Sequence, residues 1–116
     1  MTQVGLRYNE LVKPGAKEAA LRSFINFYIH QYREKSLEIM GAKTSNKVMS
    51  TINEYLKENE YLDNEELAKA SENFSKPLYE ELLNTITDVK FTQEGQPQVS
   101  WEKLWQKEEE KLPTED

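Results

Sequence analysis

The sequence predicts an all-α fold: a small four-helix bundle or an orthogonal helical array, with an irregular N-terminal arm and a C-terminal extension ending in a short helix. Apolar residues recur at helical spacings in successive segments of the chain. Capping residues, glycine or proline stand where these segments begin and end. The connections are only a few residues long, which favours neighbouring helices that pack antiparallel. A chain of 116 residues is long enough to build one core.

Residues 1–16 form the predicted arm, because Gly5, Pro14 and Gly15 interrupt its few apolar positions. The helical domain spans residues 17–88, and its first helix is expected to start at Lys17 and end before Gly41, a favourable left-handed cap. Its apolar stripe has steps of three, four and seven residues. The stripe consists of Leu21, Phe24, Ile25, Tyr28, Tyr32 and Ile39.

A second helix is expected to begin at a cap provided by Thr44 or Ser45 and to end near Asn59. Its apolar face follows steps of four, three and one residues. That face consists of Val48, Ile52, Tyr55 and Leu56.

Asp63 and Glu66 have the spacing of a capping box, so a third helix is expected to start there. Its apolar face is Leu67, Ala70 and Phe74. Pro77 removes a backbone donor and restricts the residue before it, which predicts a break or kink near Ser75. Ser75 can cap a fourth helix that runs to about Asp88, with an apolar face of Leu78, Leu82, Leu83 and Ile86.

Residues 89–116 are predicted to be a linker followed by a short tryptophan-containing helix and an acidic tail. An alternative for the linker is a two-stranded hairpin that pairs Val89 and Phe91 with Val99 and Trp101. Pro97 weakens that alternative, and an isolated hairpin is only marginally stable. Ser100 is the expected cap of the last helix.

The net charge of −6 argues against nonspecific nucleic-acid binding, which depends on lysine and arginine contacts to phosphate. The charge is uneven, at +3 over residues 1–43 and −9 over residues 44–116. Solvated helix faces explain this pattern, and self-association or a basic partner are the alternatives. No segment is apolar enough for a membrane span or a signal peptide, and there is no cysteine. We therefore expect a cytoplasmic protein with no membrane partner.

No residue pattern predicts catalysis, a cofactor or a metal site. The only histidine, His30, lies off the apolar stripe and is expected to be exposed; with Glu34 it offers two ligands, fewer than a transition-metal site needs. The four glycines are dispersed, so no phosphate-binding glycine loop can be written. No glutamate is marked as buried in an apolar pocket, as general acid catalysis would require.

The predicted partner-binding residues are Trp101, Leu104, Trp105, Phe27 and Ile29. The first three form an i, i+3, i+4 triplet that could dock in a partner's groove as an amphipathic helix. Phe27 and Ile29 are the apolar residues of the first helix that its stripe explains least, and if exposed they would form a patch that needs another chain. In the alternative, the triplet folds back on its own bundle, and in a third case it is exchanged between two subunits of a homodimer.

The resulting functional hypothesis is a non-enzymatic protein-protein interaction module, an accessory or regulatory subunit that binds another protein. The alternative is an acidic inhibitor or immunity-type protein that blocks a basic, nucleic-acid-binding site on its target. A small-molecule pocket inside the bundle is a third hypothesis, which no residue pattern favours.

Overall fold

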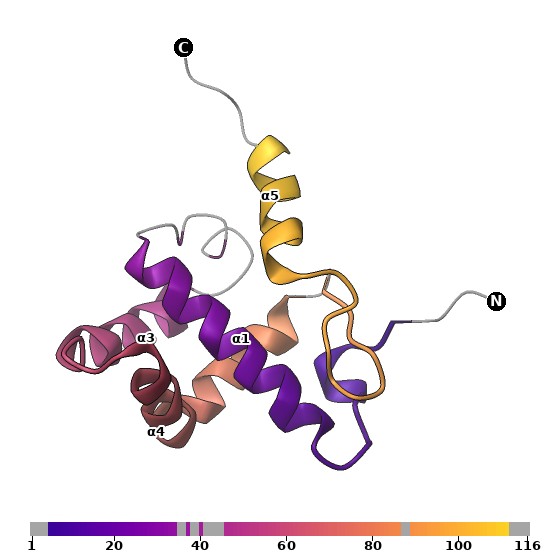
Figure 1. Cartoon of the computed structure of the whole chain (residues 1–116), viewed down its shortest axis with the longest axis horizontal. Coiled ribbons are helices and arrows are strands. Elements are labelled where there is room, and N and C mark those ends of the chain that lie inside the picture. The colour runs from indigo at the N-terminus through magenta and orange to yellow at the C-terminus, as the bar shows by residue number, and fades with distance from the viewer. Residues whose placement is uncertain (1–4, 35–36, 38–39, 41–45, 87–88, 112–116) are drawn as a thin grey trace.

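The computed structural model describes residues 5–34, 37, 40, 46–86 and 89–111. It confirms the all-α class, since the described residues form helices, turns and isolated bridges and contain no β-strand. Figure 1 shows α1 crossing in front of α4, with α3 beside them and α5 projecting away from the other helices. The elements are the 3₁₀ turn η1 (Tyr8–Glu10), α1 (Ala16–Arg33), α3 (Asn46–Glu58), α4 (Asn64–Thr85) and α5 (Trp101–Lys111).

Helix α1 begins one residue before the expected start and ends sooner than expected. The N–H of Glu34 donates to the carbonyl of His30 at 3.0 Å and closes the last turn. In the sequence, the positions one turn after Tyr32 are the polar residues Lys35 and Ser36, so the apolar spacing is interrupted there. The prediction that this helix continues to Ile39 was therefore wrong. Ile39 itself and the expected cap at Gly41 lie outside the described residues.

Helix α3 has the predicted position, and two of the four residues of its predicted face are buried. Ile52 and Leu56 are buried, and Met49, which the predicted face omitted, is buried beside them. Val48 and Tyr55 are only partly covered. The two candidate capping residues before this helix lie outside the described residues.

Helix α4 unites the predicted third and fourth helices. The predicted capping box is present, because the Glu66 N–H donates to Asp63 Oδ1 at 2.8 Å and the Asp63 N–H donates to Glu66 Oε1 at 3.3 Å. The predicted break also occurs, as a kink at Ser75 with φ −116° and ψ 17°, two residues before Pro77.

Phe74 was wrongly placed on the buried face of this helix. The row that faces the core has steps of four and consists of Leu67, Ser71 and Ser75. Phe74 lies off that row, and its side chain is 76% exposed. The presence of two serines on the buried row is why apolar spacing alone selected the wrong residues.

The centre of the core lies between α1 and α4 and is built from aromatic rings. Phe24, Tyr28 and Tyr79 meet edge to face, with ring centroids 5.5–6.2 Å apart. The Tyr28 hydroxyl donates to Asn53 Oδ1 at 2.7 Å and so connects α1 to α3. These contacts position α1, which carries much of the candidate site.

The N-terminal arm packs against the helices from Leu6 onward. Tyr8 is buried, and its hydroxyl donates to Glu80 Oε2 at 2.6 Å, which attaches the arm to α4. Leu6 forms two backbone hydrogen bonds with Phe91, of 2.7 and 3.0 Å. The described part of the arm is therefore a fixed part of the fold.

Residues 89–100 pack against the core and are not the free linker that the sequence predicted. Val89 and Phe91 are buried, and Phe91 pairs with both Leu6 and Pro97 in isolated antiparallel bridges. The hairpin alternative had the right partner segment in the wrong register, since Phe91 pairs with Pro97 and Val99 stays partly exposed. Burial of two large side chains provides the free energy that orders this polar segment.

Candidate functional site

Helix α5 attaches to α1 through an aromatic cluster. The Trp101 ring stacks on Phe27 at a centroid distance of 5.5 Å, and Trp105 meets Phe27 edge-on at 4.9 Å. Trp101 also contacts Phe24 at 5.5 Å and Phe91 at 6.1 Å. The structure therefore brings three of the five predicted partner-binding residues together, inside the protein's own core.

The remaining two predicted residues lie nearby. Ile29 is buried on α1, and Leu104 is half-buried on α5. Because Phe27 and Ile29 are buried, they do not form the exposed apolar patch that the sequence allowed. The reason is that α1 is covered on two sides, by α4 along its apolar stripe and by α5 over Phe27. The observed arrangement is the one in which the tryptophan segment folds back on its own bundle.

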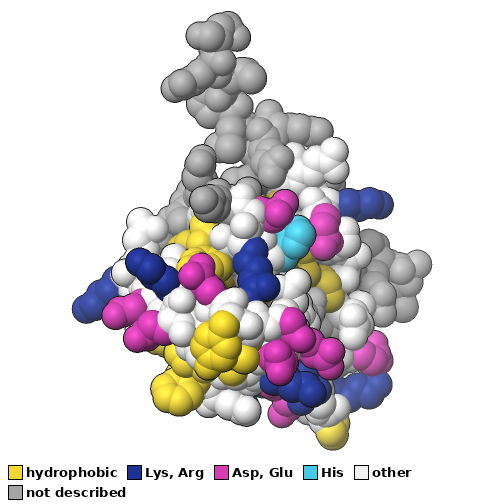
Figure 2. All heavy atoms as spheres, turned by 60° about the vertical axis from the view of Figure 1, so that its left-hand side comes forward, with side chains coloured by type: hydrophobic (Ala, Val, Ile, Leu, Met, Phe, Trp, Pro, Cys, Tyr) yellow, Lys and Arg dark blue, Asp and Glu magenta, His cyan; other side chains and the backbone are white. Residues whose placement is uncertain are grey.

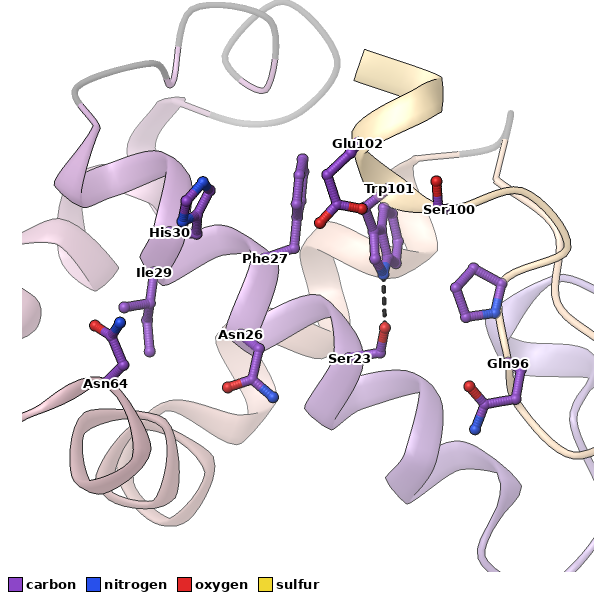
Figure 3. A pocket seen from close by; sticks show the side chains of 11 residues that line it. Ser23, Asn26, Phe27, Ile29, His30, Asn64, Gln96, Ser100, Trp101 and Glu102 are labelled. Carbon is purple, nitrogen blue, oxygen red and sulfur yellow. Dashed lines mark hydrogen bonds between the residues drawn. The ribbon is translucent and has the colours of Figure 1, made fainter. Parts of the chain in front are cut away.

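A hydrogen bond fixes the position of Trp101. Its indole Nε1 donates to the Ser23 hydroxyl at 2.7 Å, as the dashed line in Figure 3 shows. At the start of α5, the Leu104 N–H donates to the Ser100 carbonyl at 3.1 Å, and the Lys103 N–H approaches the Ser100 hydroxyl at 3.4 Å. The predicted capping role of Ser100 fits this geometry.

An open pocket of about 530 Å³ lies beside this hydrogen bond. Its walls come from α1, from the first residue of α4, and from the segment that leads into α5 (Figure 3). The lining residues are Ser23, Asn26, Phe27, Ile29, His30, Asn64, Gln96, Pro97, Ser100, Trp101 and Glu102. Three of the predicted residues, Phe27, Ile29 and Trp101, thus contribute the apolar floor of one site.

Three side-chain amides surround that floor. In Figure 3, Asn64 and Gln96 lie on opposite sides of α1, with Asn26 between them. All three residues are exposed, and their amide groups make no hydrogen bond to the part of the chain that the structure describes. Each amide offers two donors and an acceptor, so the pocket presents hydrogen-bonding capacity of both kinds to a ligand.

The wall that carries Gln96 is held by a tight turn. The Thr92 N–H donates to the Gln96 carbonyl at 2.7 Å, and the Gly95 N–H donates to the Thr92 carbonyl at 2.9 Å. Gly95 adopts φ 88°, a left-handed conformation that favours glycine, and packs directly on the backbone of Ala16 at the start of α1. This close contact fixes the separation between the turn and α1.

Two salt bridges involve residues that are close in sequence to those lining the pocket. Lys13 Nζ lies 2.9 Å from Glu94 Oε2, and this pairing holds the pKa of the Glu94 carboxyl below its usual value. A second cavity, of about 560 Å³, lies between α1 and α4 and shares Asn26 and Asn64 with the first. The ion pair of Arg22 Nε and Glu72 Oε1, at 3.1 Å, forms part of its wall.

His30 is exposed, as predicted, and lies at the rim of the pocket. Its imidazole makes no hydrogen bond to a described serine or carboxylate, and the Ser23 hydroxyl already accepts a bond from Trp101. Among the described residues, no group of three or more acidic or histidine side chains is arranged to hold a metal ion. What the described site offers is shape, an apolar floor, the neutral amides and the carboxylate of Glu102.

Sequence reasoning missed the amides of Asn26, Asn64 and Gln96. They come from three separate elements, so no spacing in the sequence connects them. The one available local signal was the capping box at Asp63, which placed Asn64 at a helix start.

The chain matches no protein-family model, no curated protein and no solved structure at a significant level. None of the helices that the structure describes has the length and apolar character needed to cross a bilayer. A functional hypothesis for this chain therefore rests on the geometry of its own residues.

Proposed function

We propose that this chain is a non-enzymatic protein-interaction module, an accessory or regulatory subunit whose pocket between α1, α4 and α5 binds an extended segment of another protein. The observation that carries the proposal is that three side-chain amides, Asn26, Asn64 and Gln96, line the pocket and have no hydrogen-bond partner among the described residues. Side-chain amides complement the N–H and C=O groups of a peptide backbone, which an extended segment leaves free.

The size of the pocket supports this kind of ligand. Its volume of about 530 Å³ is within the range of ligand pockets in proteins, roughly 300–1,000 Å³. The pocket opens to solvent, so a chain segment can cross it and continue on either side. Trp101 and Phe27 line the floor of the pocket, where each is 4% exposed and so offers an inserted apolar side chain only a small aromatic contact.

The predicted role of the tryptophan helix changes under this proposal. Trp101 contributes to binding as part of the floor of the pocket, while Leu104 and Trp105 act by holding α5 in place. Docking of the whole helix into a partner's groove would first require the loss of the ring contacts and of the bond to Ser23. A homodimer with exchanged α5 helices and a cytoplasmic location stay predictions.

Site-specific photo-crosslinking tests the proposal. A benzophenone amino acid is placed at Asn64 or at Gln96, and at Asn84 as an exposed control elsewhere on α4. The expected result in a lysate of the source cells is a protein that crosslinks at both pocket positions and not at the control. An excess of the unlabelled wild-type chain should prevent crosslinking, and an Asn26→Ala/Asn64→Ala chain should not. Identical crosslinks at all three positions, or none at the pocket, would overturn the proposal.

The acidic inhibitor is a second candidate, because carboxylates are concentrated on one part of the molecule. Residues 46–85 carry nine acidic and four basic side chains, a net charge of −5. An inhibitor that acts mainly through this charge should lose affinity steeply as salt rises from about 50 to about 300 mM, whereas binding through amides in the pocket should change little. A salt titration of the complex separates the two candidates.

A further inference from the structure

Two aromatic rings form an exposed shelf on the outer side of α3 and α4. Tyr55 of α3 and Phe74 of α4 stack with centroids 5.1 Å apart and an angle of 20° between the ring planes. Phe74 is 76% exposed even though it is in this stack. We call this pair, Tyr55 and Phe74, the aromatic shelf.

The helical spacing of α4 leaves Phe74 outside the core. Ser71 and Ser75 belong to the buried row of α4, and Phe74 lies off that row. The non-helical backbone at Ser75 follows Phe74 directly, and the ring is directed away from the core onto Tyr55. Figure 2 shows hydrophobic side chains standing out from the surface on this side of the molecule, among acidic and basic ones.

A stacked pair from two helices is a stronger signal than a single exposed residue. Isolated exposed apolar residues are normal on protein surfaces, but aromatic residues grouped on a rigid scaffold are typical of contact sites. The shelf is held in place because both residues belong to helices that pack on one core. A partner therefore meets an ordered apolar surface without a cost for ordering it.

An exposed carboxylate lies next to the shelf. Glu58 follows Tyr55 by one helical turn and so is its neighbour on the surface of α3, whereas Glu54, directly before Tyr55, projects to a different side of the helix. Neither glutamate forms an ion pair within the part of the chain that the structure describes. The Glu58 carboxylate is therefore available to a cationic group placed on the rings.

We propose that the aromatic shelf docks a basic, arginine-bearing segment of a partner protein. A guanidinium group stacks on an aromatic face and pairs with a neighbouring carboxylate at the same time, which matches both features of this surface. A second copy of the chain is a poor occupant, because two shelves facing each other would bring the Glu58 carboxylates of both copies close together with no cation to pair with them. The inference stands whether or not the pocket binds a peptide.

Peptide selection tests the proposal without a known partner. A library of random peptides of about 15 residues is selected on the immobilised full chain, and each enriched peptide is measured against variants. Phe74→Ala removes the exposed ring, and Val12→Ala is the matched control, because Val12 is 91% exposed and lies on the N-terminal arm. Glu58→Gln removes one carboxylate beside the shelf, and Glu18→Gln on α1 is the control for the charge change.

The expected result is a class of peptides rich in arginine that lose affinity by roughly tenfold or more on Phe74→Ala. Their affinity should also fall on Glu58→Gln and at higher salt, and should be unchanged by Val12→Ala, by Glu18→Gln and by the pocket variant Asn26→Ala. Far-ultraviolet circular dichroism checks that Phe74→Ala retains the fold, as substitution of an exposed ring predicts.

Three results would overturn the inference. The first is that no selected peptide depends on Phe74, and the second is that the Phe74-dependent peptides are neutral or acidic. The third is sedimentation that shows a dimer of the full chain which Phe74→Ala dissociates. Loss of binding on Asn26→Ala alone would place the peptide in the pocket and would leave the shelf without a ligand.

Discussion

Replacement of Gly95 by alanine should strongly lower the free energy of unfolding, although it adds only one methyl group. A Cβ at this position would collide with the carbonyl group of Ala16, and the φ of 88° is unfavourable for alanine. The left-handed backbone costs about 1–2 kcal/mol, and the overlap with a fixed backbone atom adds roughly 1–3 kcal/mol. Gly95→Ala should therefore lower the free energy of unfolding by about 2–5 kcal/mol, a large part of the roughly 5–15 kcal/mol of a typical domain.

Gly15→Ala is a matched control for this prediction. Gly15 has nearly the same φ, 80°, but no atom lies within 4 Å of the position of its missing Cβ. This variant should show only the conformational cost of about 1–2 kcal/mol. Urea denaturation followed by circular dichroism gives both values, and with a slope of about 1–3 kcal/mol/M the Gly95→Ala midpoint should fall by about 1 M or more.

The difference between the two variants isolates the contact with Ala16. If Gly95→Ala and Gly15→Ala destabilised the protein equally, the turn at residues 93–95 would be able to move away from α1 at no cost. The wall of the pocket would then not be fixed by the contact between Gly95 and Ala16. Because Gln96 follows this glycine directly, the same result would also weaken the argument for a preorganised binding site.

Other consequences of the structure can be tested by single substitutions. Ser23→Ala leaves the Trp101 indole without its acceptor and should lower stability by about 1–2 kcal/mol with a shift in tryptophan emission, whereas unchanged stability would show that the bond is dispensable. Burial raises the pKa of Tyr8 and of Tyr28 above the usual 10, and the hydrogen bond to Glu80 raises the pKa of Tyr8 further. The folded state therefore keeps protons at alkaline pH that the unfolded state releases. The contribution of these tyrosines to stability should be constant below about pH 9 and should fall above about pH 10, by up to about 1.4 kcal/mol per pH unit for each tyrosine. Tyr28→Phe should reduce that slope in urea midpoints measured against alkaline pH. Asp63→Ala removes the capping box and should cost about 1 kcal/mol in thermal or urea unfolding, and a neutral effect would contradict the capping role.

The elements that could be predicted from the sequence are those set by local interactions. The capping box of Asp63 and Glu66 joins residues three apart, and the kink near Pro77 follows from a missing backbone donor. The apolar stripe of α1 was also predicted correctly from Leu21 to Tyr28, because a single neighbouring helix, α4, covers it. Local rules determine these features without knowledge of the rest of the fold.

The failures share a different cause. Phe27 and Phe74 are both aromatic helix residues, yet Phe27 is buried because α5 reaches it from far along the chain, and Phe74 is exposed because serines occupy the buried row. Periodicity describes one covered face per helix and cannot represent a second neighbour or a polar core position. The amides of the candidate site were missed for the same reason, since only tertiary structure brings Asn26 and Gln96 to one pocket.

The contacts that attach the two ends of the described chain also bear on how the protein folds. The bonds Tyr8–Glu80, Ser23–Trp101 and Lys13–Glu94 join residues 72, 78 and 81 positions apart. Helical proteins usually fold fast because their contacts are local, but these closures require nearly the whole chain. On the ribosome, the first helix cannot acquire its final neighbours until the last helix has emerged. Before that moment its aromatic face is open to chaperones and to other nascent chains.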